Sequence, residues 1–252
     1  MAGKPRSAVF TTVLWNGDSK IADLDEHLAR LIRHAKRLRI NLPKDTRRRL
    51  ASKLNELTDK TLQTQLLNIT YNVADRDFVI TPRRLPKLRN CELHAMTMPM
   101  KGWLGEVTGT KHGDWQMYLD AKTEAQENGA DIALFVDEYS IIDSDRASLI
   151  VIDDDGVAYV SNSAKSVHGV TLQILIDGLN HMGVPLSYAK LNERLVARCS
   201  EVIAVGVGVG CCRILTIDGE KVGSDNAVIY PVFLNYLAQH YSNSNNWIAL
   251  CD

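Results

Sequence analysis

A helical pattern that runs almost directly into an apolar strand gives the strongest constraint on the fold of this chain. The helical pattern covers residues 115–127, and the strand Ile-Ala-Leu-Phe-Val-Asp follows at 132–137. Two further strand patterns, at 148–153 and 157–161, are joined by Asp154-Asp155-Gly156, a turn typical of a β-hairpin. This part of the chain is therefore expected to hold both helices and strands.

Lys111 stands shortly before the helical pattern, in the stretch Gly-Thr-Lys-His-Gly at residues 109–113. The N-terminus of a helix carries partial positive charge and favours anions, so an ammonium group is poorly sited there. A lysine in this position suggests a chemical role. The alternative is an ordinary solvated lysine.

The first part of the chain predicts two helices and strands around them. Leu24, Leu28, Leu31, Ile32, Ala35 and Leu38 recur three and four positions apart within residues 21–42, which is typical of a helix with one buried face. Asp23 or Asp25 is available to cap it.

The remaining predicted elements are a helix at 46–57, strands at 64–74, 92–98 and 201–207, helices at 170–182 and 191–198, and a last helix that begins near Val228.

The stretch TPRRLPKLR, residues 81–89, marks the expected domain boundary. It holds two prolines and four basic residues in nine positions, which favours an exposed connection. The predicted domains are residues 1–84, a small N-terminal domain, and residues 89–252, a larger domain that carries Lys111. The polar and then apolar tail YSNSNNWIALCD is expected either to dock or to fray.

The net charge, the length of the apolar runs and the cysteines indicate the expected cellular location and the expected binding partners. The formal net charge of -1 gives no bulk attraction toward nucleic acid or an anionic membrane. The longest run of apolar residues and glycines, 202–212, is shorter than the roughly 20 residues that span a bilayer. The five cysteines include no CxxC pair, which argues against a disulfide framework and a zinc site. We expect a cytoplasmic protein with no metal, no nucleic-acid partner and no membrane partner.

Four stretches, taken together, resemble one enzyme family. They are Lys111 before its helix, Asp143 in EYSIIDSDRAS, the segment SVHGVT at 166–171, and Arg30 in HLARL. Their order and spacing resemble the class IV aminotransferases, the pyridoxal phosphate enzymes of fold type IV, which include branched-chain and D-amino acid aminotransferases and aminodeoxychorismate lyase. The resemblance covers nearly the whole chain. It implies an α+β fold with a small N-terminal α/β domain and a larger C-terminal domain built on a mixed, barrel-like sheet with helices.

The resemblance also implies roles for a lysine and an acid. The family bonds its cofactor aldehyde to a lysine upstream of a strand similar to GADIAL, residues 129–134, which identifies Lys111 as the catalytic and cofactor-binding lysine. Asp143 stands where the family usually has a glutamate that bonds the pyridine nitrogen. The nearby Asp145 is a second candidate for this role. The alternative for Asp143 is an ordinary aspartate of a turn.

Phosphate binding is the third implied requirement. Gly169, Val170 and Thr171 resemble the family's Gly-Ile-Thr, where a helix N-terminus and a hydroxyl bind phosphate oxygens. The second phosphate loop falls at VGVGVG, residues 205–210, so that Gly206, Val207 and Gly208 offer backbone N–H groups but no hydroxyl. Arg30 would complete the phosphate site. The glycine run could instead be a strand with a bulge, and Arg30 could lie on a solvated face.

The residues that bind the substrate are less well marked. Tyr71 stands where the resemblance implies an arginine that many family members use for the substrate carboxylate. Arg76, Arg146 or Arg213 could substitute for it, although each of them is more often an exposed arginine. Trp115 is expected to line the pocket, although an aromatic residue on a helix is more often part of the core. His112, beside Lys111, is either a proton shuttle or a surface histidine.

Three functions remain open at this point. The first is a pyridoxal phosphate-dependent aminotransferase that acts on an amino acid and a 2-oxo acid. The second is an aminodeoxychorismate lyase, which makes 4-aminobenzoate for folate synthesis. The third is a fold type IV protein that has lost catalysis and only binds. The resemblance implies a homodimer in each case.

Overall fold

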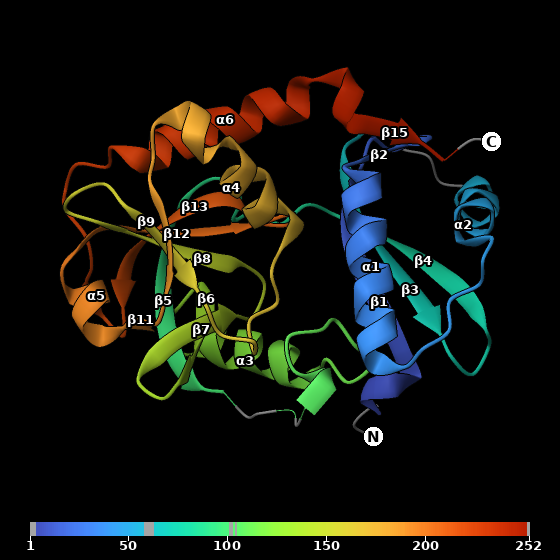
Figure 1. Ribbon diagram of the computed structural model, residues 1–252, viewed down its shortest axis with the longest axis horizontal. Helices are drawn as coiled ribbons and strands as arrows, with labels where there is room; N and C mark the ends of the chain where they lie inside the picture. Colours follow the sequence, from blue (N-terminus) through green and yellow to red (C-terminus); the bar gives the residue numbers. More distant parts are fainter. Residues whose placement is uncertain (1–3, 58–62, 101–102, 104, 251–252) are drawn as a thin grey trace. The chain divides into compact units, whose positions relative to one another are not determined.

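The computed structural model describes residues 4–57, 63–100, 103 and 105–250 (Figure 1). The chain forms two compact units. The first comprises residues 1–85, 104–116 and 240–252, and the second comprises residues 86–103 and 117–239. Two segments from later in the chain therefore belong to the same unit as its N-terminal part. No single boundary in the sequence can divide the chain into these two units. The division into domains at 84–89 stays a prediction.

The first unit is built on an antiparallel sheet with the strand order β15-β2-β1-β3-β4. Its strands are β1 (Ala8–Trp15), β2 (Lys20–Ala22), β3 (Gln65–Asn72), β4 (Asp77–Arg83) and β15 (Trp247–Ala249). Its helices are α1 (Leu24–Leu38) and α2 (Thr46–Asn55), with short 3-10 turns at η1 (Pro5–Ser7), η2 (Gly105–Val107) and η3 (Ser244–Asn246). The core of this unit packs α1 against β1 and β3 around Trp15, Leu31 and Leu67, all fully buried.

Helix α1 confirms the predicted pattern with two differences. Its buried apolar positions are the expected ones except Ile32, which is 54% exposed. Asp23 stands at the N-cap with a φ of 50°, yet its side chain caps no helix N–H. Its carboxylate instead lies 2.7 Å from Nε2 of His240. This contact and the pairing of β15 with β2 show that the C-terminal tail docks rather than frays, as far as residue 250.

The first three residues of the expected exposed connection at 81–89 are exposed, but they belong to a strand rather than to a connection. Strand β4 continues to Arg83, and Pro82 stands opposite Leu67 of β3. Strand β4 is the edge of its sheet, where a proline that lacks an N–H is tolerated.

The second unit is built on a ten-stranded mixed sheet. Its strands are β5 (Glu92–Pro99), β6 (Ile132–Asp137), β7 (Ser140–Ser144), β8 (Ser148–Asp153), β9 (Ala158–Ser161), β10 (Leu186–Ala189), β11 (Leu191–Asn192), β12 (Cys199–Gly206), β13 (Gly210–Ile217) and β14 (Glu220–Lys221). The order is β10-β9-β8-β12-β13-β5-β6-β7-β11, with β14 beside β13. Only Lys190 separates β10 from β11 in the chain, so the two ends of the sheet are brought together in a nearly closed barrel. The α+β prediction with a barrel-like sheet is confirmed.

The helices of the second unit are α3 (Gln116–Glu127), α4 (Val170–Met182), α5 (Glu193–Ala197) and α6 (Ile229–Ser242). The first residue of α3 and the last three residues of α6 are assigned to the first unit. The core residues of the barrel include Leu134, Val151, Val202 and Ile214. The β8–β9 hairpin forms as predicted, with Ile150 opposite Val160. Strand β7 was not predicted, and it contains Asp143, which was expected in a connection between two strands.

Two further expectations concern membranes and cysteines. Among the described residues, the helices are all too short or too polar to cross a membrane. Cys91, Cys199, Cys211 and Cys212 are free thiols, and Cys251 lies outside the described residues. No cluster of potential metal ligands occurs within the described part of the chain.

Candidate active site

Lys111 lies in the first unit, on a segment held against strand β1. Its carbonyl accepts a hydrogen bond from the Phe10 N–H at 3.3 Å, and the next residue, His112, bridges to Val9. Helix α3 begins at Gln116, five residues after Lys111. The Nζ atom lies 5.2 Å from the ring centre of Phe10 and 4.7 Å from that of Trp115. Aromatic rings thus flank the lysine that the sequence singled out.

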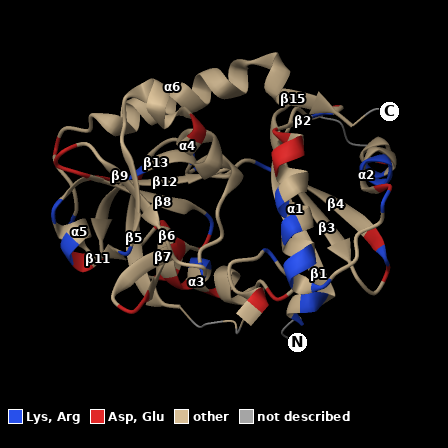
Figure 2. Cartoon of the chain, viewed as in Figure 1, with Lys and Arg blue, Asp and Glu red and all other residues tan. Residues whose placement is uncertain are grey.

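Arg30 lies on the buried face of α1, with 3% of its surface exposed. Its Nη2 donates a hydrogen bond to Oγ1 of Thr11 at 2.8 Å, whereas its buried Nε has no partner. Burial, followed by the nearby Arg33, lowers the pKa of Arg30 to about 10. Figure 2 shows further basic residues along α1. No carboxylate of the described residues forms an ion pair with Arg30.

A buried charge without a counter-charge is costly to a protein. An anionic ligand would remove this cost at Arg30, because its free Nε–H could then donate a charge-assisted hydrogen bond. The solvated-face alternative for Arg30 does not hold, since the side chain is buried.

Three buried histidines surround these two cations. Nδ1 of His27 lies 3.0 Å from Thr11 Oγ1, and burial, then Arg30, then Lys111 hold the pKa of His27 well below its usual value. His34 Nδ1 accepts the Lys111 backbone N–H at 3.1 Å. His112 is 1% exposed, so it is not a surface histidine, and burial lowers its pKa to about 4.

The sequence reasoning missed His27 and His34. The signal was available, because positions 27, 30, 31, 34 and 38 of α1 share one face by their spacing of three and four. Three of these five positions are polar, and all five side chains are buried. A buried polar stripe on an otherwise apolar helix face indicates a functional surface.

The two aromatic candidates of the first unit have different settings. Trp115 is half-buried and packs edge-on against Phe10, with ring centres 4.9 Å apart, beside the Lys111 ammonium. Trp115 precedes α3 rather than lying within it. Tyr71 belongs to the core cluster of the first unit and packs against Phe78. A role for either residue in binding substrate stays a prediction.

Asp143 lies in the second unit, on strand β7, and is 4% exposed. Its Oδ1 accepts the Ser144 N–H at 2.9 Å, and its Oδ2 accepts the Val167 N–H at 2.8 Å. Two backbone donors therefore fix the direction of this carboxylate. The second donor belongs to the segment that leads into α4, so Asp143 also orders that segment. Asp145 is instead engaged by Arg146 Nε at 2.6 Å and by the Ala133 N–H.

The N-terminus of helix α4 has the features of an anion site. Gly169 is the N-cap residue and has no side chain to cap the helix, so the first backbone N–H groups lack a side-chain partner. Thr171 is 1% exposed, and its Oγ1 is buried without a hydrogen-bond partner. A buried hydroxyl without a partner is rare and costly, and a bound phosphate oxygen would satisfy it.

The glycine-rich turn lies at the same end of the barrel as this helix N-terminus. Ser148 Oγ accepts the Gly169 N–H at 3.2 Å, and Ser148 stands opposite Val205 of β12. A Cβ added to Gly206 would lie only 3.0 Å from the Arg146 carbonyl oxygen. The structure thus brings together, within the second unit, the segments of Asp143, of Gly169–Thr171 and of Gly206.

Arg89, which precedes strand β5, binds the backbone of the glycine-rich turn. Arg89 Nη1 donates to the carbonyl oxygens of Val207 and Gly208, at 2.5 and 2.9 Å. Strand β12 ends at Gly206 and β13 begins at Gly210, so the run 205–210 is a strand end followed by a turn, rather than a strand with a bulge. Gly206, Val207 and Gly208 carry no hydroxyl, so a phosphate role for this turn, which would depend on backbone N–H groups, stays a prediction.

Arg146 lies between β7 and β8, beside the turn at Gly206. Its Nε is bound to Asp145, whereas its buried Nη2 has no hydrogen-bond partner. An arginine anchored at one edge keeps its other edge available for an anion. Its assignment to the substrate carboxylate stays a prediction.

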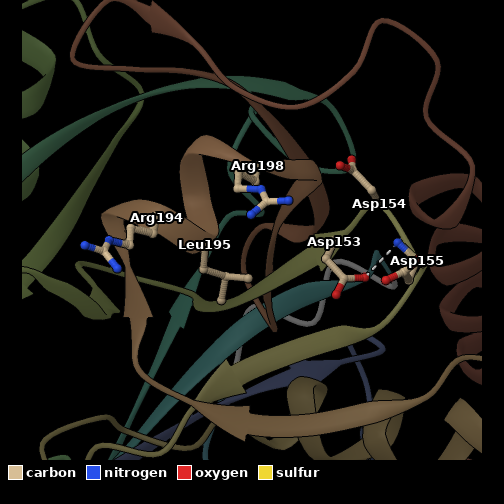
Figure 3. A pocket seen from close by; sticks show the side chains of 6 residues that line it. All are labelled: Asp153, Asp154, Asp155, Arg194, Leu195 and Arg198. Carbon is tan, nitrogen blue, oxygen red and sulfur yellow. Dashed lines mark hydrogen bonds between the residues drawn. The ribbon is translucent and has the colours of Figure 1, made fainter.

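A surface pocket elsewhere in the second unit is not part of this site. Figure 3 shows Arg194, Leu195 and Arg198, from α5 and its C-terminal end, around the β8–β9 turn with Asp153, Asp154 and Asp155. Asp153 Oδ1 accepts the Asp155 N–H within that turn. None of the residues predicted for catalysis or cofactor binding lines this pocket.

A comparison with protein families identifies the family of this chain. The family model described as amino-transferase class IV matches residues 8–217. The chain belongs to the class IV aminotransferase family. A search of curated proteins gives no match to this chain.

Solved structures share the fold at low sequence identity. The branched-chain aminotransferase of Thermoproteus uzoniensis, solved with norvaline, has a TM-score of 0.81 and 15% identity, over 98% of this chain and 91% of that one. A hypothetical aminotransferase from Mycobacterium tuberculosis has a TM-score of 0.79 and 18% identity, over 93% and 89%. The branched-chain aminotransferase of Escherichia coli has a TM-score of 0.77 and 17% identity, over 90% and 83%. The fold type IV prediction is confirmed.

Proposed function

We propose that this chain is a pyridoxal phosphate-dependent aminotransferase that moves an amino group between an amino acid and a 2-oxo acid. The observation that carries the proposal is the pair of unsatisfied buried donors, Arg30 Nε and Thr171 Oγ1. Both are suited to phosphate oxygens, and both occur at positions that the family uses for that purpose. Family membership supplies the reaction class.

The cofactor-binding roles follow from the chemistry of each side chain. Arg30, the backbone N–H groups of Val170 and Thr171, and the Thr171 hydroxyl would bind the phosphate, at the helix N-terminus that Gly169 opens. The backbone N–H groups of Gly206, Val207 and Gly208 would add to them. Asp143 would accept a hydrogen bond from the pyridine nitrogen, because its carboxylate is already held in one direction by two backbone donors.

Lys111 would both hold the cofactor and move a proton. The bound cofactor supplies an electron sink for the bonds at the substrate's α-carbon. The Lys111 amine would act as the base that removes the substrate's α-proton and would later return a proton. The Phe10 and Trp115 rings flank the Nζ atom, 5.2 and 4.7 Å away, and would favour a cationic state of the nitrogen.

The substrate class is proposed from the family and from three related structures. One M. tuberculosis structure contains α-ketoglutarate and pyridoxamine phosphate, another contains pyridoxal phosphate, and the T. uzoniensis enzyme was solved with norvaline. Arg146 is our candidate for the substrate carboxylate, with Tyr71 and Trp115 as further substrate-binding residues. We also propose a cytoplasmic homodimer.

Turnover by the purified, cofactor-loaded protein tests this function. A panel of amino acids with 2-oxoglutarate should give glutamate and the matching 2-oxo acid in equal amounts, with ping-pong kinetics. The Lys111→Ala variant should give neither. Pyruvate released from aminodeoxychorismate, without transfer to 2-oxoglutarate, would show a lyase instead. A protein that binds the cofactor but converts none of these substrates would contradict the proposal.

A further inference from the structure

We propose that His34 is a positioning residue that fixes the backbone of Lys111 and thereby the approach of its amine to an aldehyde. The inference rests on the proposed function, because it assigns Lys111 a covalent role. His34 itself touches neither substrate nor cofactor in this account.

Hydrogen bonds from two elements hold the Lys111 peptide groups. On one side, Nδ1 of His34 accepts the Lys111 N–H at 3.1 Å. On the other side, the Phe10 N–H donates to the Lys111 carbonyl oxygen at 3.3 Å. Helix α1 and strand β1 therefore clamp this residue, and the direction of its Cα–Cβ bond is set by both.

The same helix supplies the phosphate-binding candidate. His34 follows Arg30 by four positions, which places both side chains on one face of α1, and each is buried. A shift of α1 would move the phosphate ligand and the Lys111 clamp together. Because His34 and Arg30 both belong to α1, this one helix sets the position of Lys111 relative to Arg30.

The charges around His34 keep it in the accepting form. The groups that act on it are Arg30, Arg33 and Arg37 from its own helix and Lys111 from the clamped segment, and all of them are cationic. Burial and these cations lower the pKa of His34 to about 2. Neutral imidazole can accept a hydrogen bond at Nδ1, whereas the protonated ring would present an N–H to the Lys111 N–H.

Three variants separate positioning from simple packing. His34→Asn places an amide oxygen close to the original Nδ1 and can still accept the bond. His34→Gln places its polar atoms near the original Nε2 and cannot accept it in the same way. His34→Leu fills the space without any acceptor. His181→Leu, at an exposed position of α4, is the matched control.

The readout is covalent labelling of the full-length protein with pyridoxal, which lacks phosphate, followed by borohydride reduction and peptide mass mapping. We measure the ratio of the labelling rate at Lys111 to that at the exposed Lys36. In His34→Leu and His34→Gln this ratio should fall by about fivefold or more, since an unpaired buried N–H lets the segment move. In His34→Asn and His181→Leu it should stay within about twofold of the original chain.

Two further measurements distinguish the outcomes. In the cofactor-loaded protein, His34→Gln should lower kcat for the amino acid with little change in KM, and His34→Asn should restore kcat. If His34→Leu does not fold, the Asn and Gln pair still decides. Equal Lys111 labelling in all variants, with Lys111 favoured over Lys36, would overturn the positioning role but not the proposed function. No preference for Lys111 in the original chain would overturn both.

Discussion

Arg30 combines deep burial with the lack of a carboxylate partner among the described residues. We therefore expect the side chain of Arg30 to lower the stability of the ligand-free protein and to raise its affinity for an anion. These two effects have opposite signs, so a single substitution separates them.

Arg30→Met should leave the free energy of unfolding unchanged or raise it by up to about 2 kcal/mol in the ligand-free protein. The affinity for pyridoxal phosphate should fall at least about tenfold, because a charge-assisted hydrogen bond is lost. Urea unfolding and a binding titration measure the two effects. Arg33→Met, at an exposed position of the same helix, should change neither by much. A large loss of stability in Arg30→Met would show that the arginine is a structural residue.

Thr171 allows a second test of the anion site with an isosteric change. Thr171→Val removes a hydroxyl that has no partner, so the ligand-free protein should gain about 1 kcal/mol of stability. Cofactor retention should weaken by about tenfold, whereas Thr171→Ser should retain the cofactor nearly as well. Dialysis against cofactor-free buffer, followed by an absorbance reading, compares the three proteins. Equal retention by Thr171→Val would remove this hydroxyl from the site.

The sequence predicted the candidate residues by type and order, and much less of their surroundings. Gly169, Val170 and Thr171 could be placed at a helix N-terminus, because the glycine precedes a clear helical pattern. The polar stripe of His27 and His34 was missed, since apolar periodicity alone assigned the buried face of α1. The contacts of the Lys111 segment with β1 could not be predicted, because Val9 and Phe10 lie about a hundred positions earlier in the chain.

At the scale of elements, Glu201 shows how a helix is fixed at its start. This carboxylate on β12 is 1% exposed and accepts the N–H groups of Val228, Ile229 and Tyr230 at 2.6 to 2.8 Å. These are donors at the first turn of α6 that no helix carbonyl satisfies. The carboxylate also faces the positive end of the helix.

Glu201→Gln should therefore lower the free energy of unfolding by about 2 kcal/mol, because charged acceptors contribute more than neutral ones. Urea unfolding followed by circular dichroism measures this loss. Glu193→Gln, at the exposed first turn of α5, is the control and should change little. An unchanged midpoint for Glu201→Gln would mean that α6 needs no such cap.

Elements with a clear period or strong end signals were predicted closely. Helix α4 has the predicted bounds, since Gly169 and Gly183 mark its two ends. Strand β7 was missed because Asp143 and two serines interrupt its apolar pattern, although every residue of it is buried. The hydrogen bond from the Val167 N–H helps to satisfy the buried Asp143 carboxylate, and this tertiary contact cannot be seen in a local pattern.

At the scale of the whole molecule, the buried histidines predict acid sensitivity. The folded-state pKa is about 2 for His34 and about 4 for His112, both below the ordinary value of 6.5. The unfolded chain therefore binds more protons below pH 6.5, and stability falls as the pH drops from there toward 4. His34 alone should lower the free energy of unfolding by about 1.4 kcal/mol for each pH unit between pH 6.5 and pH 4.

Urea unfolding followed by tryptophan fluorescence, at several pH values, tests this slope, since Trp15 is fully buried in the same unit. His34→Asn, which cannot titrate, should flatten the slope by about 1.4 kcal/mol per pH unit. His181→Gln, at an exposed position, should leave it unchanged. A slope identical in all three proteins would contradict the neutral state of His34.

The packing of residues 104–116 and 240–252 with the first unit is the feature that the sequence could least predict. It depends on pairing between segments about a hundred or more positions apart, such as Val9 with His112 and Ile21 with Ile248. Local periodicity carries no information on such partners. The resemblance to a family supplied the fold class, and the structure supplied the unit in which Lys111 lies.

The most direct test of the account is the covalent attachment of pyridoxal phosphate. The purified chain is incubated with the cofactor, reduced with borohydride and digested, and the modified peptide is identified by mass spectrometry. The account predicts one cofactor per chain on Lys111, and no stoichiometric attachment in Lys111→Ala. Attachment spread over exposed lysines, or the same stoichiometry in Lys111→Ala, would contradict it.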